Sequence, residues 1–464
     1  MLRSLFVAAI FFPWFFRAIR SRFDALLLYL WFAFFRPQDW LWIDISGLRP
    51  SLVLGVVLTV PALLTGVWPN VTHPLSIGSV LFLLTAVVAH TNAVNPDVSL
   101  EWLGFQARVT LIALLATTLI TTRRRLVAAL AVVAGSLGFH AAKAGLASLL
   151  AGGARYADGL SGAYFDNNGY ALAVVMVIPF LYAVGQTIDL LFDEEPPRWV
   201  RWCRIGIFAA LPLCAMTVVS TFSRAGLLAL VAVILTYLFL VRGKARWALA
   251  AGTIVAVAIV GLSLPEGYLD RVETIRTYDE VGDVSSLSRL HFWKVALNMA
   301  EAEPLGVGLR NYDYAYNRYD FSNGEFGPNR AVHNSHLEVL AELGYAGAVI
   351  WVVQFGLAFL VAFRVRSRAR TPGLAPESAR LLMAVSNAII ASMVGFIVGG
   401  TFIALALNDL TWMTFAFLAA TDRIAASLCA EAGRTWMESQ PQSYARGLAG
   451  GVTAPAAALA GRRT

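Results

Sequence analysis

The sequence predicts an all-α polytopic membrane protein, and the prediction rests on composition and on segment length. Hydrophobic residues make up 58% of the 464-residue chain and charged residues 14%, whereas soluble domains carry about 25% charged residues. A membrane-spanning helix needs about 20 mostly apolar residues, and short polar or Pro- and Gly-marked breaks divide most of the chain into segments of roughly that length. This composition excludes a soluble enzyme, a disulfide-stabilised scaffold and a disordered protein.

The apolar segments predict about 12 or 13 spanning helices in chain order. Twelve of them lie at 23–35, 51–68, 75–91, 102–122, 126–150, 169–187, 205–221, 225–241, 247–264, 336–363, 381–403 and 408–421. The stretch 5–16 is short for a span, so it is either a thirteenth helix or a helix at the membrane interface. If 5–16 crosses the membrane, the N-terminus lies outside the cytoplasm.

Clusters of arginine and lysine between these segments indicate the topology. They are Arg17, Arg20 and Arg22; Arg123, Arg124 and Arg125; Arg242, Lys244 and Arg246; Arg364, Arg366, Arg368, Arg370 and Arg380; and Arg423. Positive residues concentrate in cytoplasmic loops, and an even number of apolar segments separates successive clusters. This parity places all the clusters in the cytoplasm and 265–335 outside it, as one large periplasmic loop.

The chain is therefore expected to have four parts. They are membrane helices over 1–264, the periplasmic loop over 265–335, C-terminal membrane helices over 336–425 and a cytoplasmic tail over 426–464. The loop holds 11 acidic and seven basic residues. Within it, Leu290, Trp293, Leu297 and Ala300 recur at helical spacing before Pro304, which predicts an amphipathic helix on the membrane surface. The tail is rich in Ala, Gly and Arg and has no long apolar run, which predicts disorder.

Cysteine and histidine spacing predicts neither a metal site nor a cofactor. The three cysteines are Cys203, Cys214 and Cys429, and they form no CxxC pair. The six histidines include no HExxH motif, and the chain has no Walker-type glycine loop. We expect no metal, no cofactor and no nucleic-acid partner.

Two arginines stand at predicted outer helix ends, where the topology rule disfavours them. Arg224 lies where two apolar helices abut, and a charge at such a boundary is a functional hypothesis by default. Arg289 falls in the predicted first turn of the loop helix, where a cation opposes the helix dipole. The alternatives are a snorkelling side chain that pairs with a lipid phosphate for Arg224, and an ion pair with acidic loop residues for Arg289.

The segment Arg330–Tyr345 carries the strongest local pattern. Ser335 and Glu338 have the Ser-x-x-Glu spacing of a capping box, which predicts a helix that begins at about His336. His333 then lies just before a helix N-terminus, where the dipole favours a neutral imidazole and attracts an anion. This setting suits a general base beside a phosphate, although a histidine before a cap is more often an ordinary loop residue.

Two smaller features favour a sugar ligand. Aromatic residues crowd one part of the loop, at Tyr312, Tyr314, Tyr316, Tyr319 and Phe321. Such rings offer stacking faces with polar edges, so Tyr312 and Tyr316 are candidate glycan contacts, while interfacial anchoring is the commoner use of Tyr. Asn167 and Asn168 open an apolar helix from the outer side, where they either cap the helix or bind sugar hydroxyls.

Four motifs follow one another on the same predicted face. They are Ser-Arg-small-Gly at Ser223 to Gly226, Arg289 followed by Phe292 and Trp293, the Pro-Leu-Gly-x-Gly turn at 304–308, and His333-Asn334 before a helix with Glu-Leu-Gly-Tyr-x-Gly up to Gly347. Over about 160–415 the chain thereby resembles the O-antigen ligase and polymerase superfamily. Its N-terminal part, with Leu2–Phe6 and Phe34–Gln38, is similar to the O-glycosylation ligase branch associated with exosortase A systems.

The resemblance implies a GT-C-type glycosyltransferase of the bacterial inner membrane with its active site on the periplasmic side. The implied donor is a glycan on undecaprenyl pyrophosphate, and the implied acceptor is a lipid A core sugar or a secreted protein. The implied transfer is metal-independent and inverting. Arg224 and Arg289 match the diphosphate-binding arginines of the family, and His333 matches its essential histidine. Supporting residues are expected at Asn334, Asp409, Arg310, Arg330 and His336.

Two other functions remain open at this point. Within the superfamily, a polymerase adds repeat units to a growing O-antigen or exopolysaccharide chain. From another class, a transporter for an anionic solute would need broken helices and ionisable residues near the membrane midplane. Lys143 is the main candidate for such a residue, whereas the other distinctive charges cluster at one face.

Overall fold

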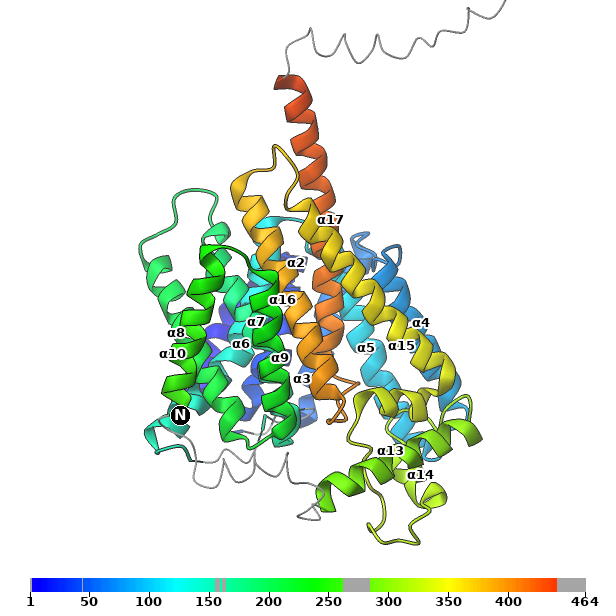
Figure 1. The fold of residues 1–464 in the computed structure, drawn as a ribbon. Coiled ribbons are helices and arrows are strands. Elements are labelled where there is room, and N and C mark those ends of the chain that lie inside the picture. The colour runs from blue at the N-terminus through cyan, green and yellow to red at the C-terminus, as the bar shows by residue number, and fades with distance from the viewer. Residues whose placement is uncertain (1, 44, 155–158, 161–163, 262–283, 440–464) are drawn as a thin grey trace, which may run out of the picture.

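The computed structural model describes residues 2–43, 45–154, 159–160, 164–261 and 284–439, and this part of the chain is helical and has no strand (Figure 1). The helices up to Gly261 are α1 (Leu2–Arg20), α2 (Arg22–Phe35), α3 (Pro50–Leu64), α4 (Pro74–His90), α5 (Pro96–Leu119), α6 (Arg123–Leu150), α7 (Asn167–Thr187), α8 (Trp199–Ser220), α9 (Arg224–Leu240) and α10 (Lys244–Gly261). The later ones are α13 (Val284–Ala302), α14 (Tyr312–Tyr319), α15 (Ser335–Arg368), α16 (Pro376–Gly400) and α17 (Asp409–Ser439). Short 3₁₀ helices are η1 (Pro37–Trp40), η2 (Ser46–Leu48) and η4 (Ile188–Leu191).

Within the described residues, eight helices are long and apolar enough to span a membrane. They are α1, α5, α6, α7 extended by η4, α8, α15, α16 and α17 up to Arg434. The predicted all-α polytopic membrane class is confirmed. The predicted number of 12 or 13 is higher because it also counted α10, which has 18 residues, and the shorter helices α2, α3, α4 and α9, which have 14, 15, 17 and 17 residues. The stretch predicted at 5–16 lies in α1, which has 19 residues.

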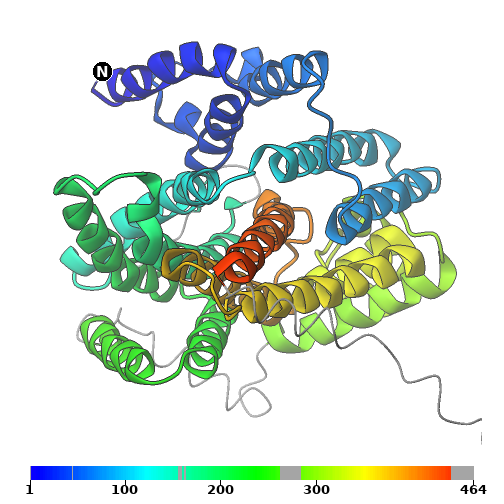
Figure 2. The same cartoon turned by 90° about the horizontal axis from the view of Figure 1, so that it is seen from above.

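Helices α7 and α16 form the centre of the bundle. In each of them, 78% of the residues in the most apolar 18-residue stretch are buried, against 11% in α1. Helix α7 packs against α6, α8, α9 and α16, and Figure 2 shows α1 along one edge of the bundle. Because α7 is packed on several sides, its first turn has a defined place among the helix ends that form the candidate site.

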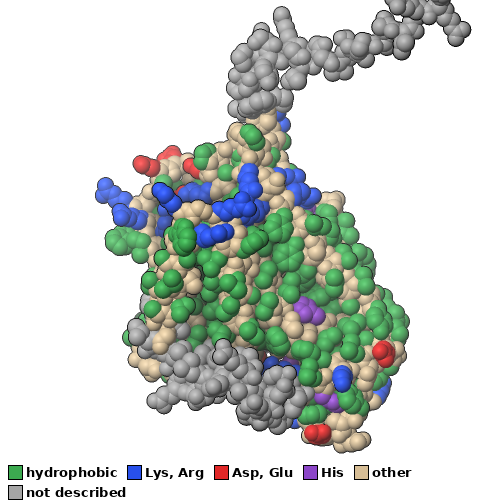
Figure 3. Space-filling view, viewed as in Figure 1, with side chains coloured by type: hydrophobic (Ala, Val, Ile, Leu, Met, Phe, Trp, Pro, Cys, Tyr) green, Lys and Arg blue, Asp and Glu red, His purple; other side chains and the backbone are tan. Residues whose placement is uncertain are grey.

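The predicted arginine clusters gather at one end of the bundle, called here the basic end, which holds the starts of α2, α6, α8 and α16 and the ends of α9 and α15. Figure 3 shows these side chains as a band beside a belt of hydrophobic side chains. The guanidinium of Arg125 lies 5.1 Å from the ring centroid of Phe23, and Arg123 donates to Ser378 Oγ at 3.1 Å. These contacts join the starts of α2, α6 and α16, so the clusters share one end as predicted.

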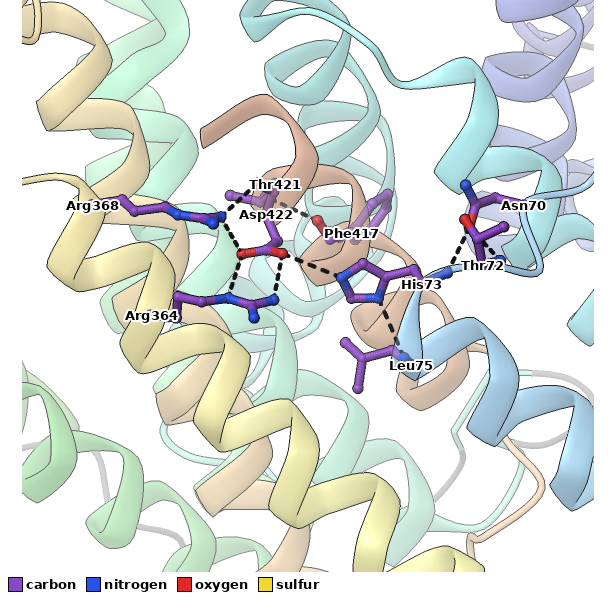
Figure 4. A network of polar contacts seen from close by, with 9 residues as sticks. All are labelled: Asn70, Thr72, His73, Leu75, Arg364, Arg368, Phe417, Thr421 and Asp422. Carbon is purple, nitrogen blue, oxygen red and sulfur yellow. Dashed lines mark hydrogen bonds and ion pairs between the residues drawn. The ribbon is translucent and has the colours of Figure 1, made fainter. Parts of the chain in front are cut away.

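A buried ionic cluster ties α4, α15 and α17 together at the basic end (Figure 4). The carboxylate of Asp422 accepts from Arg364 at 3.1 and 2.6 Å and from Arg368 at 2.8 Å. His73, which precedes α4, lies 3.4 Å from the same carboxylate. Asp422 is 6% exposed, and a buried charge is costly without such partners. The cluster therefore favours one register among the three helices.

The opposite end, called here the site end, carries α13 and α14 beside the start of α15 (Figure 1). A cluster of buried side chains holds them together: Phe292, Val295, Ala296, Met299, Val307, Tyr312, Ala315, Tyr316, Val332 and Ala341. The helix predicted before Pro304 is confirmed as α13. It begins at Val284, so Arg289 lies in its second turn and not in its first. Leu290 and Leu297 are exposed, and their contact with the membrane surface stays a prediction.

Helix α15 breaks at Gly344, where φ is 65°. The carbonyl of Glu342, just before the break, accepts the N–H of Gly308 at 3.0 Å. A Cβ atom on Gly306 would lie 2.3 Å from the oxygen of Glu342, and one on Gly344 would lie 2.1 Å from the oxygen of Pro304. Both positions need glycine, since φ is positive and the backbones are in close contact.

The C-terminal boundary differs from the prediction. Helix α17 continues through Ser439, because the alanine-rich stretch after 425 has high helix propensity. The prediction of a disordered tail is therefore wrong for 426–439. Residues 440–464 and the loop residues 265–283 lie outside the described part of the chain.

Candidate active site

Asn334, and not Ser335, caps the N-terminus of α15. Its Oδ1 accepts the N–H of His336 at 2.9 Å and that of Leu337 at 3.1 Å. The helix begins at Ser335, one residue earlier than predicted, and the predicted capping box is wrong. The helix dipole would attract an anion at this terminus, but Asn334 already accepts two of the first N–H groups, so these two are not free to bind the anion.

Ser335 and Glu338 instead bind the segment between α16 and α17. Ser335 Oγ accepts the N–H of Leu405 at 2.9 Å, and Glu338 accepts the N–H of Ala406 at 3.0 Å. Both side chains are buried. They hold the segment that leads to Asp409 against the first turn of α15.

Arg310 lies beside two buried glutamates of α15. Its Nη1 donates to Glu338 at 3.4 Å, and its backbone N–H donates to Glu342 at 2.7 Å. Its guanidinium also lies 4.9 Å from the ring centroid of Trp102 on α5. Burial lowers the pKa of Arg310, whereas the carboxylates of Glu338, Glu342 and Asp313 raise it, and the net shift is upward. The charge of Arg310 is thus permanent, and it joins the outer segment to α5 and α15.

His333 is exposed at the site end and has a positive φ of 48°. Its ring centroid lies 6.4 Å from that of Phe292. The surrounding protein displaces water from His333, which lowers the pKa of its imidazole. The positive charges of Arg289 and Arg330 lower this pKa further, whereas the negative charge of Asp166 raises it. The net pKa is below the ordinary 6.5. At neutral pH the imidazole is therefore uncharged and can accept a proton.

His336 is held by the protein through both ring nitrogens. Trp351 Nε1 lies 3.1 Å from Nδ1 of His336, and Nε2 of His336 lies 3.2 Å from the carbonyl oxygen of Ile397. An indole N–H only donates, so Nδ1 accepts and Nε2 carries the proton and donates. His333 is consequently the accessible imidazole of the pair.

Arg224 is the first residue of α9. Asn167 Nδ2 donates to the carbonyl of Thr221 at 2.9 Å, which ties the start of α7 to the junction between α8 and α9. Asp166, next to Asn167, is close enough for its charge to act on His333. The turn at 166–167 therefore links the junction that carries Arg224 with the surroundings of the imidazole.

Helix α7 is capped by Asp166, whose carboxylate accepts the N–H of Gly169 at 3.0 Å. Asn168 Nδ2 lies 3.2 Å from Asn167 Oδ1. Capping by the two asparagines, one of their two predicted roles, is therefore wrong. Their binding of sugar hydroxyls stays a prediction.

Tyr312 and Tyr316 are buried, with 1% and 0% of their surface exposed. The hydroxyl of Tyr312 donates to the carbonyl of Phe292 at 2.7 Å, and that of Tyr316 lies 3.5 Å from Asp320. Their expected contact with a glycan is wrong, because the rings form the core of the outer segment. Tyr314 and Phe321 are 50% and 53% exposed and are the most accessible rings of this run.

A cavity of about 690 Å³ opens at the site end between α2, α5, α15 and α17. Its charged lining residues are Arg36, Glu101, Arg108, Asp166, Arg310, Glu338 and Asp409. Asp409 accepts the hydroxyl of Tyr164 at 2.8 Å, and the guanidinium of Arg36 lies 5.8 Å from the ring centroid of Tyr164. Asp166 belongs both to this lining and to the surroundings of His333, whereas His333, Arg224 and Arg289 are not among the residues that line the cavity.

The cavity contains residues that the sequence prediction missed. Arg36 follows the apolar stretch 23–35 at the end that the parity of the segments places outside the cytoplasm, so the argument made for Arg224 applied to Arg36 as well. Asp166 and Arg108 carried no comparable signal. Arg330, one of the predicted supporting residues, is exposed and donates to a backbone carbonyl of its own loop.

A helical bundle with a basic end, and with a cavity and an exposed imidazole at the other end, defines a multi-pass membrane protein with a polar site at one membrane face. Residues 208–352, which include Arg224, Arg289 and His333, match the family described as O-Antigen ligase. Residues 2–190 match a family of unknown function, DUF5935. The chain matches no curated protein.

The predicted relation to the O-antigen ligase-like superfamily is confirmed by the first of these matches, and the chain is a membrane enzyme of the O-antigen ligase and polymerase type. The exosortase-associated branch stays a prediction.

Proposed function

We propose that this protein is a ligase that transfers a glycan from undecaprenyl pyrophosphate to a hydroxyl group of an acceptor. The main support is the position of His333, an accessible imidazole with a lowered pKa on which the charges of Arg289 and Asp166 act. This group lies within the segment that matches the O-Antigen ligase family. The acceptor is a lipid A core sugar or a secreted protein.

Arg224 and Arg289 bind the diphosphate of the donor in this proposal. A guanidinium offers a planar fork that matches two phosphate oxygens. The barrier to transfer falls when charge that develops on the bridging oxygen is stabilised, and two arginines supply this stabilisation. The leaving group then needs no general acid, and the proposed reaction uses neither a metal ion nor a cofactor.

His333 is the general base of the proposed reaction. It takes the proton of the acceptor hydroxyl while the hydroxyl oxygen attacks the anomeric carbon. The bond from that carbon to the pyrophosphate oxygen breaks on the opposite face, so the configuration inverts, and undecaprenyl pyrophosphate leaves with the electron pair. General-base catalysis contributes roughly 10²–10⁴-fold, and alignment of two large substrates can contribute more.

The cavity at the site end is proposed to hold sugar residues of one substrate. Its volume of about 690 Å³ lies in the range of ligand sites, which combine apolar walls with a few polar groups. Tyr29, Trp102 and Phe105 supply aromatic walls, and Arg108 and Asp409 supply polar groups.

We place the basic end in the cytoplasm and the site end in the periplasm, with the protein in the bacterial inner membrane. The support is the positive-inside rule together with the gathering of the arginine clusters at one end (Figure 3). Lys143, the candidate residue of a transporter, lies 20 positions after the start of α6, which is about 30 Å along the helix. That position lies past the middle of this 28-residue helix, on the side of the site end, which disfavours a residue at the midplane and hence a transporter.

Transfer by purified protein without a solute gradient tests the proposal. The wild type should move a glycan from the lipid-linked donor to a lipid A core acceptor or to a protein acceptor. A ladder of repeat units that grows on the lipid carrier without either acceptor would instead identify a polymerase. Absence of transfer together with gradient-dependent uptake of an anion would reject the enzyme and favour a transporter.

A further inference from the structure

A second cavity, of about 560 Å³, lies at the basic end of the bundle. Its walls come from the end of α7, the start of α8, the junction of α9 and α10, the end of α15 and the start of α16. Five arginines line it: Arg204, Arg242, Arg366, Arg370 and Arg380. Helices far apart in the sequence supply these side chains, so the cluster is a product of the folded bundle and not of one basic loop.

Two of the five arginines have an acidic partner at the edge of the cavity. Asp189 accepts from Arg204 at 2.6 Å and from Arg380. Asp189 does not belong to the lining, and the described lining residues include no carboxylate. One carboxylate thus serves two guanidinium groups on this side.

The other three arginines lack a compensating charge within the part of the chain that the structure describes. Arg366 donates to the side chain of Asn387 and to a backbone carbonyl, which are both neutral. Arg242 and Arg370 form no ion pair with described residues, and their positive charges act on Arg366. Three like charges beside one cavity repel one another, and an anion in the cavity would offset this repulsion.

Apolar side chains complete the lining, at Phe208, Leu240 and Met383. Phe239 and Trp247, which flank the stretch of chain along this wall, are 79% and 76% exposed. Trp247 lies near the start of α10, and an exposed Trp beside a basic cluster is typical of the level of lipid headgroups. The cavity therefore combines a cationic site with an apolar surface at the depth where headgroup and acyl chain meet.

We propose that this cavity binds an anionic phospholipid from the membrane leaflet at the basic end. The phosphate oxygens accept hydrogen bonds from Arg242, Arg366 and Arg370, and the glycerol and the first acyl carbons lie against Phe208 and Met383. Arginine forks suit phosphodiester oxygens, and basic pockets between spanning helices bind such headgroups. A soluble phosphate ion satisfies the arginines but leaves the apolar wall without a partner.

The bound lipid joins the junction of α9 and α10 to the ends of α15 and α16. A ligand that binds only the folded state stabilises it in proportion to the logarithm of its concentration. Added anionic lipid should therefore raise the temperature at which the delipidated protein unfolds, and the rise should continue with the logarithm of the lipid concentration while the number of bound lipids levels off.

The test compares a pocket variant with a charge-matched control. The pocket variant combines Arg242→Gln with Arg370→Gln. The control combines Arg20→Gln with Arg201→Gln. These two arginines are exposed, belong to segments predicted to be cytoplasmic and do not line the cavity. Each protein is delipidated in detergent and titrated with cardiolipin, phosphatidylglycerol, phosphatidylcholine or inorganic phosphate. Native mass spectrometry counts the bound lipids.

Cardiolipin or phosphatidylglycerol should stabilise the wild type and the control alike. The pocket variant should need at least about tenfold more of the same lipid, since each arginine near a headgroup contributes about a factor of five or more. The proposal would be overturned if the two double variants needed the same lipid concentration for the same stabilisation. It would also be overturned if phosphatidylcholine stabilised the wild type as much as the anionic lipids do. An equal effect of inorganic phosphate would overturn it in favour of a soluble anion. If the pocket double variant does not fold, the two single variants and the lipid count of the wild type decide the question by the same criteria.

Discussion

His333 and His336 lie three positions apart, yet their surroundings predict opposite consequences of the same substitution. Asparagine is the matched change, because it removes a basic ring nitrogen at either position. It also adopts positive φ more readily than most residues, which suits the φ of 48° at His333. His333→Asn should therefore keep the fold and lose the base.

The magnitudes follow from the contacts. Loss of a general base should slow transfer by roughly 10²–10⁴-fold, while donor binding through the arginines persists. At His336, the shorter amide cannot bridge Trp351 and Ile397, which lie 3.1 and 3.2 Å from opposite ring nitrogens. Two lost hydrogen bonds correspond to about 2 kcal/mol of stability, with turnover of the folded protein close to that of the wild type.

Three measurements on each variant separate the two roles: single-turnover transfer, donor binding and thermal unfolding in detergent. His333→Asn should change the first and not the other two, and His336→Asn should change the last. If His336→Asn is the inactive variant while His333→Asn turns over normally, the assignment of the base is wrong. If both variants transfer at the wild-type rate, the reaction uses no protein base.

Three other predictions follow from the site and the topology. Arg224→Lys and Arg289→Lys should each lose most transfer activity and still fold, because a lysine lacks the planar fork; transfer and thermal unfolding measure the two effects. Arg330→Gln should move the acid limb of the rate profile to higher pH, since the positive charge of Arg330 lowers the pKa of the general base, and the pH dependence of kcat/KM measures this shift. In sealed right-side-out membrane vesicles, an impermeant thiol reagent should label a cysteine introduced by Asn323→Cys and leave the exposed native thiol of Cys203 unlabelled.

Each of these predictions has a contradicting result. Near-normal turnover in both lysine variants would reject the diphosphate role of the two arginines. An acid limb that stays in place, or moves to lower pH, in Arg330→Gln would show that the limb does not report His333. Labelling of Cys203 in place of the introduced cysteine would invert the proposed topology, and permeabilised vesicles, in which both thiols react, provide the control.

The helices were largely predictable because a membrane span is encoded locally. A run of apolar residues such as 169–187 becomes α7 almost at its predicted bounds, since the backbone satisfies its own hydrogen bonds within each helix. Which runs are long enough to span the membrane was harder to predict. The run 23–35 becomes a helix of 14 residues, close to its predicted bounds but shorter than a span needs, and it ends at Arg36, which adopts a left-handed conformation.

The candidate site was less predictable because its partners are distant in the sequence. Ser335 and Glu338 have the spacing of a local cap, but their partners lie 70 and 68 positions away, and the tertiary contacts prevail over the local one. The tyrosine run had a similar problem, since composition does not reveal which rings face the core. His333 was placed correctly just outside α15, because a helix start is a local property that survives a change of capping residue.

The contact between Gly306 and the backbone near Gly344 has a consequence for recombination between relatives. The turn at 304–308 and the break at 341–345 meet backbone to backbone at Gly306 and Gly344, so neither can change shape alone. A chimaera whose crossover falls between them inherits the turn from one parent and its docking surface from the other. We expect such crossovers to be tolerated only when both parents carry glycine at both positions, which makes 304–345 a single unit of exchange.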